Sequence, residues 1–384
     1  MKHTANIYPV PLYKFGGTHK AMGRAQGEAL AGLIRGARAF LLASEEIELA
    51  RPRFLPGKWF LAAAQWGMWM KYTAHIQRYY PRQFERLMGI ARGARVSPEF
   101  VMLLQAMEVE MNKVDYFMPG ACSAVGVRGT RAAGGEPLVI KNFDYPDNFR
   151  EMYVVREDAP VARNRVLCST AAPLTGNHDG INEHGLVICY NYGYGQDEPR
   201  VHAPITLLVQ EALETCRTTA EAASLITRSK RCGGALLLIC DAGGDLCTLE
   251  MSNTLTRHRA PQHSVVINTN HYLDDIMAKI DVPREAVYTS KVVRPLRGVR
   301  CRESSEIRYA RILELLAQNE TLDDQALINI FSDHGEQGVP SDNTICRHSN
   351  YFNTTATMVF YPTRRVMKIA HGNPCCSEYV EFEL

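Results

Sequence analysis

The sequence predicts an α+β protein in which helices pack outside two β-sheets. Apolar residues recur at helical spacing through the first third of the 384-residue chain. After Cys122 the pattern changes to short segments rich in β-branched and aromatic residues, with helices between the later ones. No repeat, low-complexity tract or interdomain linker interrupts this order, so we expect a single domain.

The helical part comes first. Residues 18–43 and 61–87 carry apolar side chains at the spacing of amphipathic helices. Ser97, Pro98 and Glu99 are typical of an N-cap, a first-turn proline and a first-turn acid, and predict a helix to about residue 112. No strand pattern competes in this third, which we therefore expect to be wholly helical.

Strands follow Cys122. We expect them at residues 123–128, 138–145, 152–156, 165–170 and 186–190, separated by Gly, Asn, Asp or Pro. The first two form a hairpin whose turn lies at residues 134–137. The turn signals at residues 176–180 and 182–185 bracket Ile181.

The rest of the chain alternates between helices and strands. A helix is expected at 205–216, and a capping box of Thr218 and Glu221 opens a second one. Two further helices are expected, one at 304–316 and one from a cap of Thr321 and Asp324 to Phe331. Strands are expected at 235–240, 246–251, 265–268, 355–360, 365–370 and 378–382.

Composition excludes several classes of protein. The net charge is +2, with 22% charged residues of both signs interspersed, which argues against a nucleic-acid partner. Residues 1–6 contain no apolar signal core, and the apolar-looking run at 59–70 is too short to cross a bilayer. We therefore expect a cytoplasmic protein without membrane partners.

Neither a disulfide framework nor a metal site is expected. The 11 cysteines include no CxxC pair. Five of the 12 histidines fall in different predicted elements: His263, His271, His334, His348 and His371. The adjacent pair Cys375 and Cys376 receives no functional interpretation.

Cys122 is the candidate catalytic residue. We hypothesise that the Ala121–Cys122 peptide bond cuts itself, so that Cys122 becomes an N-terminal nucleophile. Its α-amine, with a pKa of roughly 7.7–8.0, would then serve as general base for a thiol whose ordinary pKa is near 8.5. Small residues on the N-terminal side suit such a bond. The alternative is an ordinary structural cysteine.

Asn142 and Asp144 lie two positions apart on the second strand of the hairpin and so share a face. If the hairpin places this strand beside Cys122, Asp144 could hydrogen-bond the new ammonium. The alternative is an aspartate that ends a strand before Pro146. Lys141 either assists cleavage or lies on the surface.

Several sequence blocks together resemble a known family. They are Ala121-Cys122-Ser123, Lys141-Asn142-Phe143-Asp144, residues 180–186, Asn268-Thr269-Asn270-His271-Tyr272 and Thr344-Ile345-Cys346-Arg347-His348. In this order they resemble the acyl-CoA:6-aminopenicillanate acyltransferase-like (peptidase C45-type) family of cysteine N-terminal-nucleophile (Ntn) hydrolases. The resemblance implies a four-layer αββα sandwich of two mainly antiparallel sheets between helical layers. It also implies cleavage into an α chain, 1–121, and a β chain, 122–384, which form one domain.

The resemblance also implies roles for individual residues. Cys122 is the nucleophile, Asp144 contacts its amine, Asn270 and Asn191 bind the oxyanion, and Arg308 is the active-site arginine. A guanidinium suits a carboxylate or carbonyl group on the substrate.

Two positions depart from the family pattern. Ala121 stands where glycine is common, which bears on the rate of cleavage. Lys141 stands where relatives of the bile-salt type carry arginine, which argues against steroid-conjugate substrates.

The predicted function is hydrolysis or transfer at a linear amide bond of a small N-acyl amine or N-acyl amino acid through a cysteine thioester. No cofactor or metal is expected, although acyl-CoA would be a co-substrate of a transferase. The alternatives are an unprocessed, silent binding protein of the same fold, a CoA-dependent N-acyltransferase, and a His-assisted cysteine hydrolase that acts without cleavage. A homo-oligomer is left open.

Overall fold

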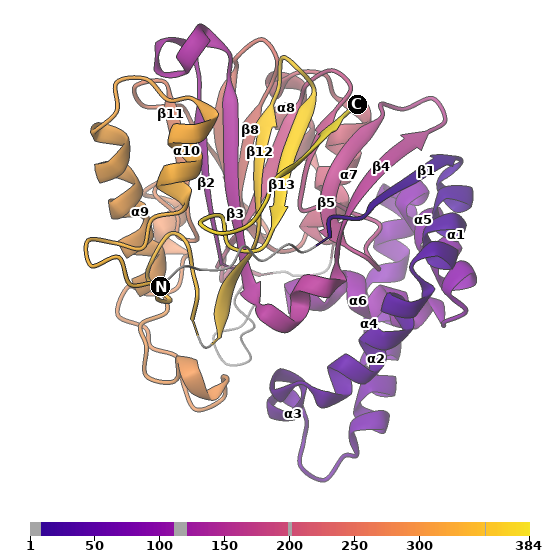
Figure 1. Ribbon diagram of the computed structural model, residues 1–384. Coiled ribbons are helices and arrows are strands. Elements are labelled where there is room, and N and C mark those ends of the chain that lie inside the picture. The colour runs from indigo at the N-terminus through magenta and orange to yellow at the C-terminus, as the bar shows by residue number, and fades with distance from the viewer. Residues whose placement is uncertain (1–8, 111–120, 199–201, 350) are drawn as a thin grey trace.

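The computed structural model describes residues 9–110, 121–198, 202–349 and 351–384. Two β-sheets stack face to face, with helices on both outer surfaces (Figure 1). This arrangement confirms the α+β class and the four-layer sandwich with two mainly antiparallel sheets. The expected end of the helix-forming segment at Pro119 and Gly120 lies in residues 111–120, which are outside the described residues.

The first sheet has eight strands in the order β1-β4-β5-β6-β7-β8-β9-β10. All its neighbours pair antiparallel except β1 and β4, which are parallel. Its strands are β1 (Leu12–Gly17), β4 (Tyr153–Pro160), β5 (Val166–Ala171), β6 (Asp179–Asn182), β7 (Val187–Gly193), β8 (Gly234–Cys240), β9 (Leu246–Met251) and β10 (Thr256–Arg259).

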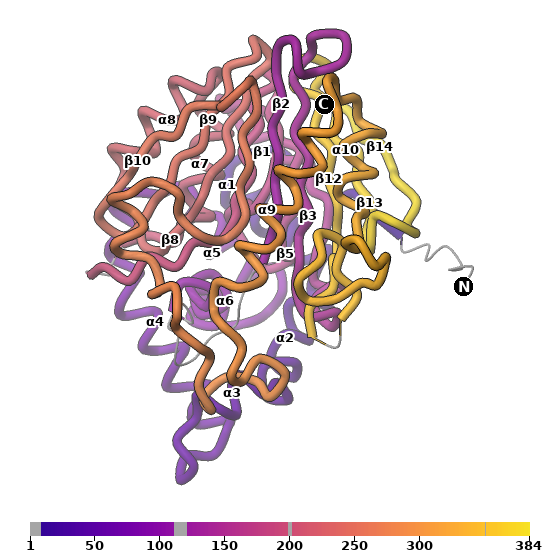
Figure 2. The backbone as a smooth tube through the Cα atoms, turned by 90° about the vertical axis from the view of Figure 1, so that its left-hand side faces the viewer, coloured from indigo at the N-terminus to yellow at the C-terminus, as the bar shows by residue number. Residues whose placement is uncertain are grey.

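The second sheet has six antiparallel strands in the order β11-β2-β3-β12-β13-β14. Its strands are β11 (Val265–Asn268), β2 (Ala121–Val127), β3 (Leu138–Pro146), β12 (Phe352–Tyr361), β13 (Val366–His371) and β14 (Val380–Glu383). Figure 2, turned by 90°, shows these strands beside β8, β9 and β10 of the first sheet.

Helices cover the two outer surfaces. The first sheet is covered by α1 (His19–Ala29), α2 (Ala31–Ala43), α4 (Gly57–Tyr79), α5 (Pro81–Ala94), α6 (Pro98–Glu110), α7 (Ile205–Thr215) and α8 (Thr219–Arg228). The short α3 (Glu45–Ala50) follows α2, and α9 (Glu303–Ala317) and α10 (Asp324–Phe331) cover the second sheet. No helix in the described part of the chain is long and apolar enough to span a membrane.

Alternation along the hairpin strands fixes which side chains face which layer. Cys122 and Ala124 of β2 belong to the core between the sheets, whereas Val125 and Val127 belong to the core under α9 and α10. The β2–β3 register pairs Cys122 with Phe143. The predicted hairpin is therefore confirmed. One of its faces packs in the core between the two sheets, and the other packs against α9 and α10.

The structure corrects the expectation that the first third contains only helices. Residues Leu12–Gly17 form β1, an edge strand that pairs with Val155 and the residues after it in β4. Six residues at a sheet edge, with burial on one side only, give a weak periodic signal. The structure also adds β6 around Ile181 and the exposed edge strand β10.

The cap of α10 is a second correction. The sequence suggested Thr321 and Asp324, but the N-cap is Asp323, whose carboxylate accepts a hydrogen bond from the Ala326 amide at 2.7 Å. The capping motif of α8 is confirmed, because Thr218 Oγ1 accepts from the Glu221 amide at 3.2 Å.

Candidate active site

Cys122 lies near the start of β2, with 2% of its surface exposed. Its side chain faces the space between the sheets, on the same side as Phe143 and Lys141, because register partners share a face. Burial raises the pKa of the Cys122 thiol to about 12, while the Lys141 ammonium acts in the opposite direction. In the uncut chain the thiol is therefore protonated at neutral pH.

The backbone of Cys122 is held by side chains from distant parts of the chain. Its N–H donates to Asn270 Oδ1 at 3.0 Å, and its carbonyl accepts from Arg308 Nη1 at 2.7 Å. Arg308 also donates to Ser123 Oγ at 2.7 Å and to Asn270 Oδ1 at 2.9 Å. The structure thus brings the predicted nucleophile together with two predicted site residues.

The orientation of the Asn270 amide follows from its partners. Oδ1 accepts from Cys122 and Arg308, while Nδ2 donates to the Tyr192 carbonyl at 3.0 Å. The Asn270 backbone N–H donates to Ser305 Oγ at 2.7 Å, which links this loop to α9. Asn270 therefore directs its oxygen at the nitrogen of the Ala121–Cys122 peptide bond, and one N–H of its amide group donates to the Tyr192 carbonyl.

Asp144 lies opposite Ala121 on β3, on the face away from the thiol. It is fully buried, and its Oδ1 accepts from Thr354 Oγ1 at 2.8 Å. Oδ2 lies 3.8 Å from Arg347 Nε and has no hydrogen-bond partner among the described residues. Burial raises the pKa of Asp144, while the Arg347 and Arg308 guanidinium groups oppose that shift.

Lys141 is not a surface residue. Its side chain is fully buried, and its ammonium donates to Asp179 Oδ1 at 2.6 Å and to the Tyr190 carbonyl. Burial alone would lower the pKa of Lys141, but the Asp179 carboxylate outweighs it and raises the pKa. Lys141 therefore remains charged on the thiol side of the hairpin.

Asn191 lies near Asn270, but its side-chain amide nitrogen already donates hydrogen bonds to the backbone. Its Nδ2 donates to the carbonyls of Asn268, at 3.2 Å, and Thr269, at 3.1 Å. These two bonds hold the segment that presents Asn270. The predicted role of Asn191 as an oxyanion donor remains a prediction.

A cavity of about 340 Å³ lies on the Asp144 side of the hairpin and reaches Ala121. Two buried guanidinium groups, Arg308 and Arg347, line it together with Asn270 and Tyr194. Arg347 Nε and Nη1 are buried without a hydrogen-bond partner in the described ranges. Burial, and then the neighbouring Arg347, lowers the pKa of Arg308, as expected where positive charge is in excess.

A second pocket lies between α2, α6 and the strand ends, and is mainly apolar. Its lining includes Phe40, Leu104, Tyr145 and Tyr153, with Glu108 as a carboxylate within it. Tyr145 and Tyr153 belong to the same inter-sheet core as the Cys122 side chain. The apolar pocket is therefore on the thiol side of the hairpin, opposite the arginine-lined cavity.

The sequence did not identify three residues of this site. Arg347 lies within block 344–348, but the sequence assigns it no role, and the pattern around Asp179 predicts only a turn. Ser305 carries no motif, although it accepts from Asn270 and donates to Thr269 Oγ1 at 3.0 Å. The available signal for Arg347 was a basic residue inside a block that resembles the family.

Comparison with known proteins gives one family and several distant structures. The sequence model of the family described as acyl-coenzyme A:6-aminopenicillanic acid acyl-transferase matches residues 131–375, more than half of the chain. The matched range contains Asp144, Asn191, Asn270 and Arg308, and it begins after Cys122. No curated protein sequence matches the chain.

Three of the similar solved structures share little sequence identity with this chain. An N-acylethanolamine-hydrolyzing acid amidase ortholog of Caenorhabditis elegans is 11% identical, covering 63% of this chain and 93% of that chain, with a TM-score of 0.44. A mutant conjugated bile acid hydrolase of Clostridium perfringens is 11% identical, covering 68% of this chain and 97% of that chain, with a TM-score of 0.41. Penicillin V acylase of Agrobacterium tumefaciens is 13% identical, covering 65% of this chain and 83% of that chain, with a TM-score of 0.40.

Because these TM-scores are low, the family model alone carries the assignment. The chain belongs to the acyl-coenzyme A:6-aminopenicillanic acid acyl-transferase family.

Proposed function

We propose that this protein is a self-cleaving Ntn amidohydrolase or acyltransferase with Cys122 as nucleophile. The observation that carries the proposal is the pair of side-chain hydrogen bonds to the Cys122 backbone at the start of a strand. Its N–H donates to Asn270, and its carbonyl accepts from Arg308. An ordinary core cysteine needs no such side-chain contacts to its backbone. Family membership supports an enzyme that acts on acyl groups.

Self-cleavage would proceed as an N→S acyl shift. The Cys122 sulfur attacks the Ala121 carbonyl carbon, the Ala121–Cys122 C–N bond breaks, and the thiol proton passes to the departing nitrogen. Water then hydrolyses the thioester, which leaves a carboxylate on Ala121 and a free thiol and amine on Cys122. Asn270 Oδ1 already faces the nitrogen that leaves.

In turnover, the new α-amine takes the thiol proton while the sulfur attacks the substrate amide carbonyl. The ammonium then protonates the leaving amine, and water or another amine accepts the acyl group from the thioester. Asn270 Oδ1 holds the amine. Asp144 Oδ2, which accepts no hydrogen bond from the residues that the structure describes, is a further acceptor on the neighbouring strand. The second N–H of the Asn270 amide is the candidate oxyanion donor.

Asn191 contributes by holding the backbone that presents Asn270. A direct role at the oxyanion requires its amide to leave the Asn268 and Thr269 carbonyls. Lys141 favours the thiolate electrostatically from the thiol side.

The two pockets favour a particular kind of substrate. The arginine-lined cavity adjoins the Ala121–Cys122 bond, so part of a later substrate would lie in it. Arg308 and Arg347 suit a carboxylate there, and the apolar pocket suits an apolar acyl group. We therefore favour an N-acyl amino acid over an uncharged N-acyl amine, with water as acceptor; acyl-CoA as donor remains the transferase alternative.

The test is the intact mass of the purified protein under denaturing, reducing conditions. Wild type should give two fragments, the larger beginning at Cys122, and Cys122→Ala should give one uncut chain. Cys189→Ala removes another buried cysteine of the same inter-sheet core and should still be cut. An uncut wild type would refute self-cleavage and leave the silent binding protein as the better reading.

A substrate panel tests the second half of the proposal. Acyl glycines and acyl ethanolamines with the same acyl chain differ mainly in the carboxylate. We expect kcat/KM to favour the acyl glycine by about 10-fold or more, the effect of one charged hydrogen bond. Equal values would show that the arginine-lined cavity does not read the carboxylate.

A further inference from the structure

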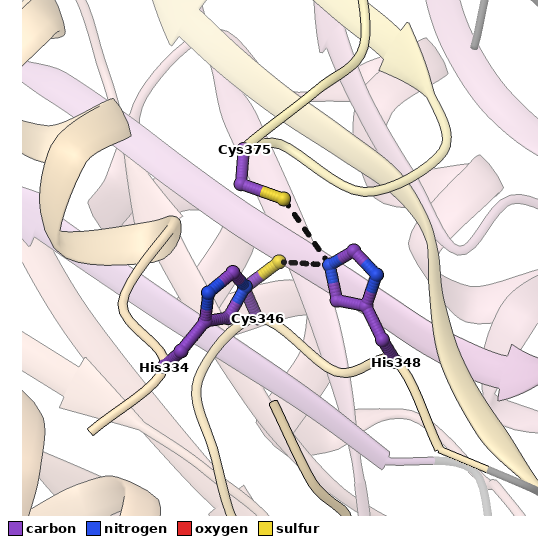
Figure 3. A group of neighbouring side chains, drawn as sticks. All are labelled: His334, Cys346, His348 and Cys375. Carbon is purple, nitrogen blue, oxygen red and sulfur yellow. Dashed lines mark hydrogen bonds between the residues drawn. The ribbon is translucent and has the colours of Figure 1, made fainter. Parts of the chain in front are cut away.

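Four potential metal ligands converge at a place that the proposed catalytic chemistry does not use. They are His334, Cys346, His348 and Cys375, and one ligand atom of each lies within 4.8 Å of all the others. His348 Nε2 is 3.3 Å from the Cys346 sulfur and 3.1 Å from the Cys375 sulfur. Figure 3 shows the four side chains pointing toward one another.

The ligands come from three separate segments of the C-terminal part of the chain. His334 follows α10, Cys346 and His348 lie before β12, and Cys375 follows β13. The sequence predicts no metal site because its histidines lie in different elements, but folding brings two of them together with two cysteines. The cluster includes Cys375, one of the two adjacent cysteines for which the sequence offered no function.

We propose that these four residues form a structural zinc site. Two thiolates and two imidazoles are the ligand set and coordination number of closed zinc sites. A tetrahedron with Zn–S near 2.3 Å and Zn–N near 2.0 Å has edges of roughly 3.3–3.8 Å, close to the two distances given above. Small side-chain movements would suffice to complete it.

A disulfide explains the geometry less well. A bond between Cys346 and Cys375 would leave two imidazole rings converging on it without a purpose. The His334 and His348 rings lie edge to face, with centroids 5.1 Å apart, and His334 Nε2 is buried without a hydrogen-bond partner in the described part of the protein. Cys375 is exposed, which gives a metal ion access to the site from solvent.

The site has a consequence for the cavity described above. Cys346 and His348 flank Arg347, and in an extended segment alternate side chains point in opposite directions. The segment is extended here, because the Arg347 backbone exchanges hydrogen bonds with Thr354, and His348 bridges to Asn353. Zinc bound on one side would therefore fix Arg347 toward Asp144 on the other. This role does not depend on the proposed self-cleavage.

The test is the metal content of the full chain, produced with zinc in the medium and without a polyhistidine tag. After gel filtration in metal-free buffer, mass spectrometry of the elements should find about one zinc per chain. Cys375→Ser should lose most of the zinc, whereas the matched control Cys376→Ser should keep it. Replacement of zinc by cobalt should give a thiolate-to-cobalt charge-transfer band that Cys375→Ser lacks.

Thermal unfolding provides a second readout that does not require a well-folded variant. A chelator should lower the Tm of the wild type and of Cys376→Ser. Fewer than about 0.1 zinc per wild-type chain would overturn the proposal, since a closed site of this kind binds tightly. So would equal zinc in both variants, or alkylation of Cys346 and Cys375 only after reduction, which would identify a disulfide.

Discussion

Arg308 connects three oxygen atoms around the bond that we propose is cut. Its guanidinium donates to the Cys122 carbonyl, to Ser123 Oγ and to Asn270 Oδ1. The side chain is buried, so these partners have no access to bulk water as a replacement. The planar fork of an arginine can bridge such a set, whereas the single ammonium of lysine cannot.

We therefore predict that Arg308→Lys slows self-cleavage although the charge is kept. Loss of one or two charge-assisted hydrogen bonds, each worth about 1.5–3 kcal/mol, corresponds to a rate reduction of roughly 10-fold or more. The measurement is the appearance of the fragment that begins at Cys122, followed by intact mass over time.

Arg300→Lys is the matched control, because Arg300 lines the same cavity but is about one-third exposed. It should cleave at the wild-type rate. Equal slowing in both variants would mean that Arg308 has no specific part in positioning the bond.

At the scale of elements, the closest packing in the helical layer is between α1 and α5. A Cβ atom added at Gly89 would lie 2.4 Å from the Lys20 carbonyl oxygen, and one at Gly23 would lie 2.1 Å from that of Arg86. The backbones thus approach too closely for any side chain. Arg86, at this crossing, makes two hydrogen bonds with Asp158 of β4, at 2.8 and 2.7 Å, and ties the helix pair to the sheet.

Gly89→Ala should separate α1 and α5 and lower the free energy of unfolding by about 1–3 kcal/mol or more, since the obstructing atoms belong to the backbone. Gly36→Ala, in the interior of α2 with nothing within 4 Å, is the control and should stabilise by up to about 1 kcal/mol. Urea unfolding of both variants in the Cys122→Ala background would measure the difference. Similar values for the two would refute the close-packing argument.

At the scale of the whole molecule, the described elements that precede Cys122 are packed into the rest of the fold. β1 forms an edge of the eight-stranded sheet through its pairing with β4, and α2, α4, α5 and α6 contribute to the core against that sheet. Helix α1 packs on α5 and contacts β1. These contacts bury a large apolar area on both sides of the proposed cut.

We predict that the two chains stay together after cleavage. Native size-exclusion chromatography should give one peak that contains both fragments, and denaturing electrophoresis should separate them. Elution of the shorter fragment alone under native conditions would contradict the packing described here. The same column reports the oligomeric state, which the sequence left open.

The sequence alone determined the class of the fold and most of its elements. Helical and two-residue periodicity are local properties, so the order of helices and the hairpin from Cys122 to Asp144 could be predicted. The connection between the two strands differs from the predicted turn at 134–137, because residues 128–137 contain two short 3-10 helices, Gly129–Arg131 and Ala133–Gly135. The short edge strands β1 and β10 could not, because few residues with burial on one side carry little periodic signal.

The candidate site divides in the same way. Local sequence blocks were enough to propose Cys122, Asp144 and Arg308 as site residues, and their catalytic roles stay predictions. The direction of the Asn270 amide, the burial of Lys141 against Asp179 and the place of Arg347 could not be predicted from the sequence. Nor was the meeting of His334, Cys346, His348 and Cys375. These features depend on contacts between segments far apart in the chain, and such contacts exist only once the layers have packed.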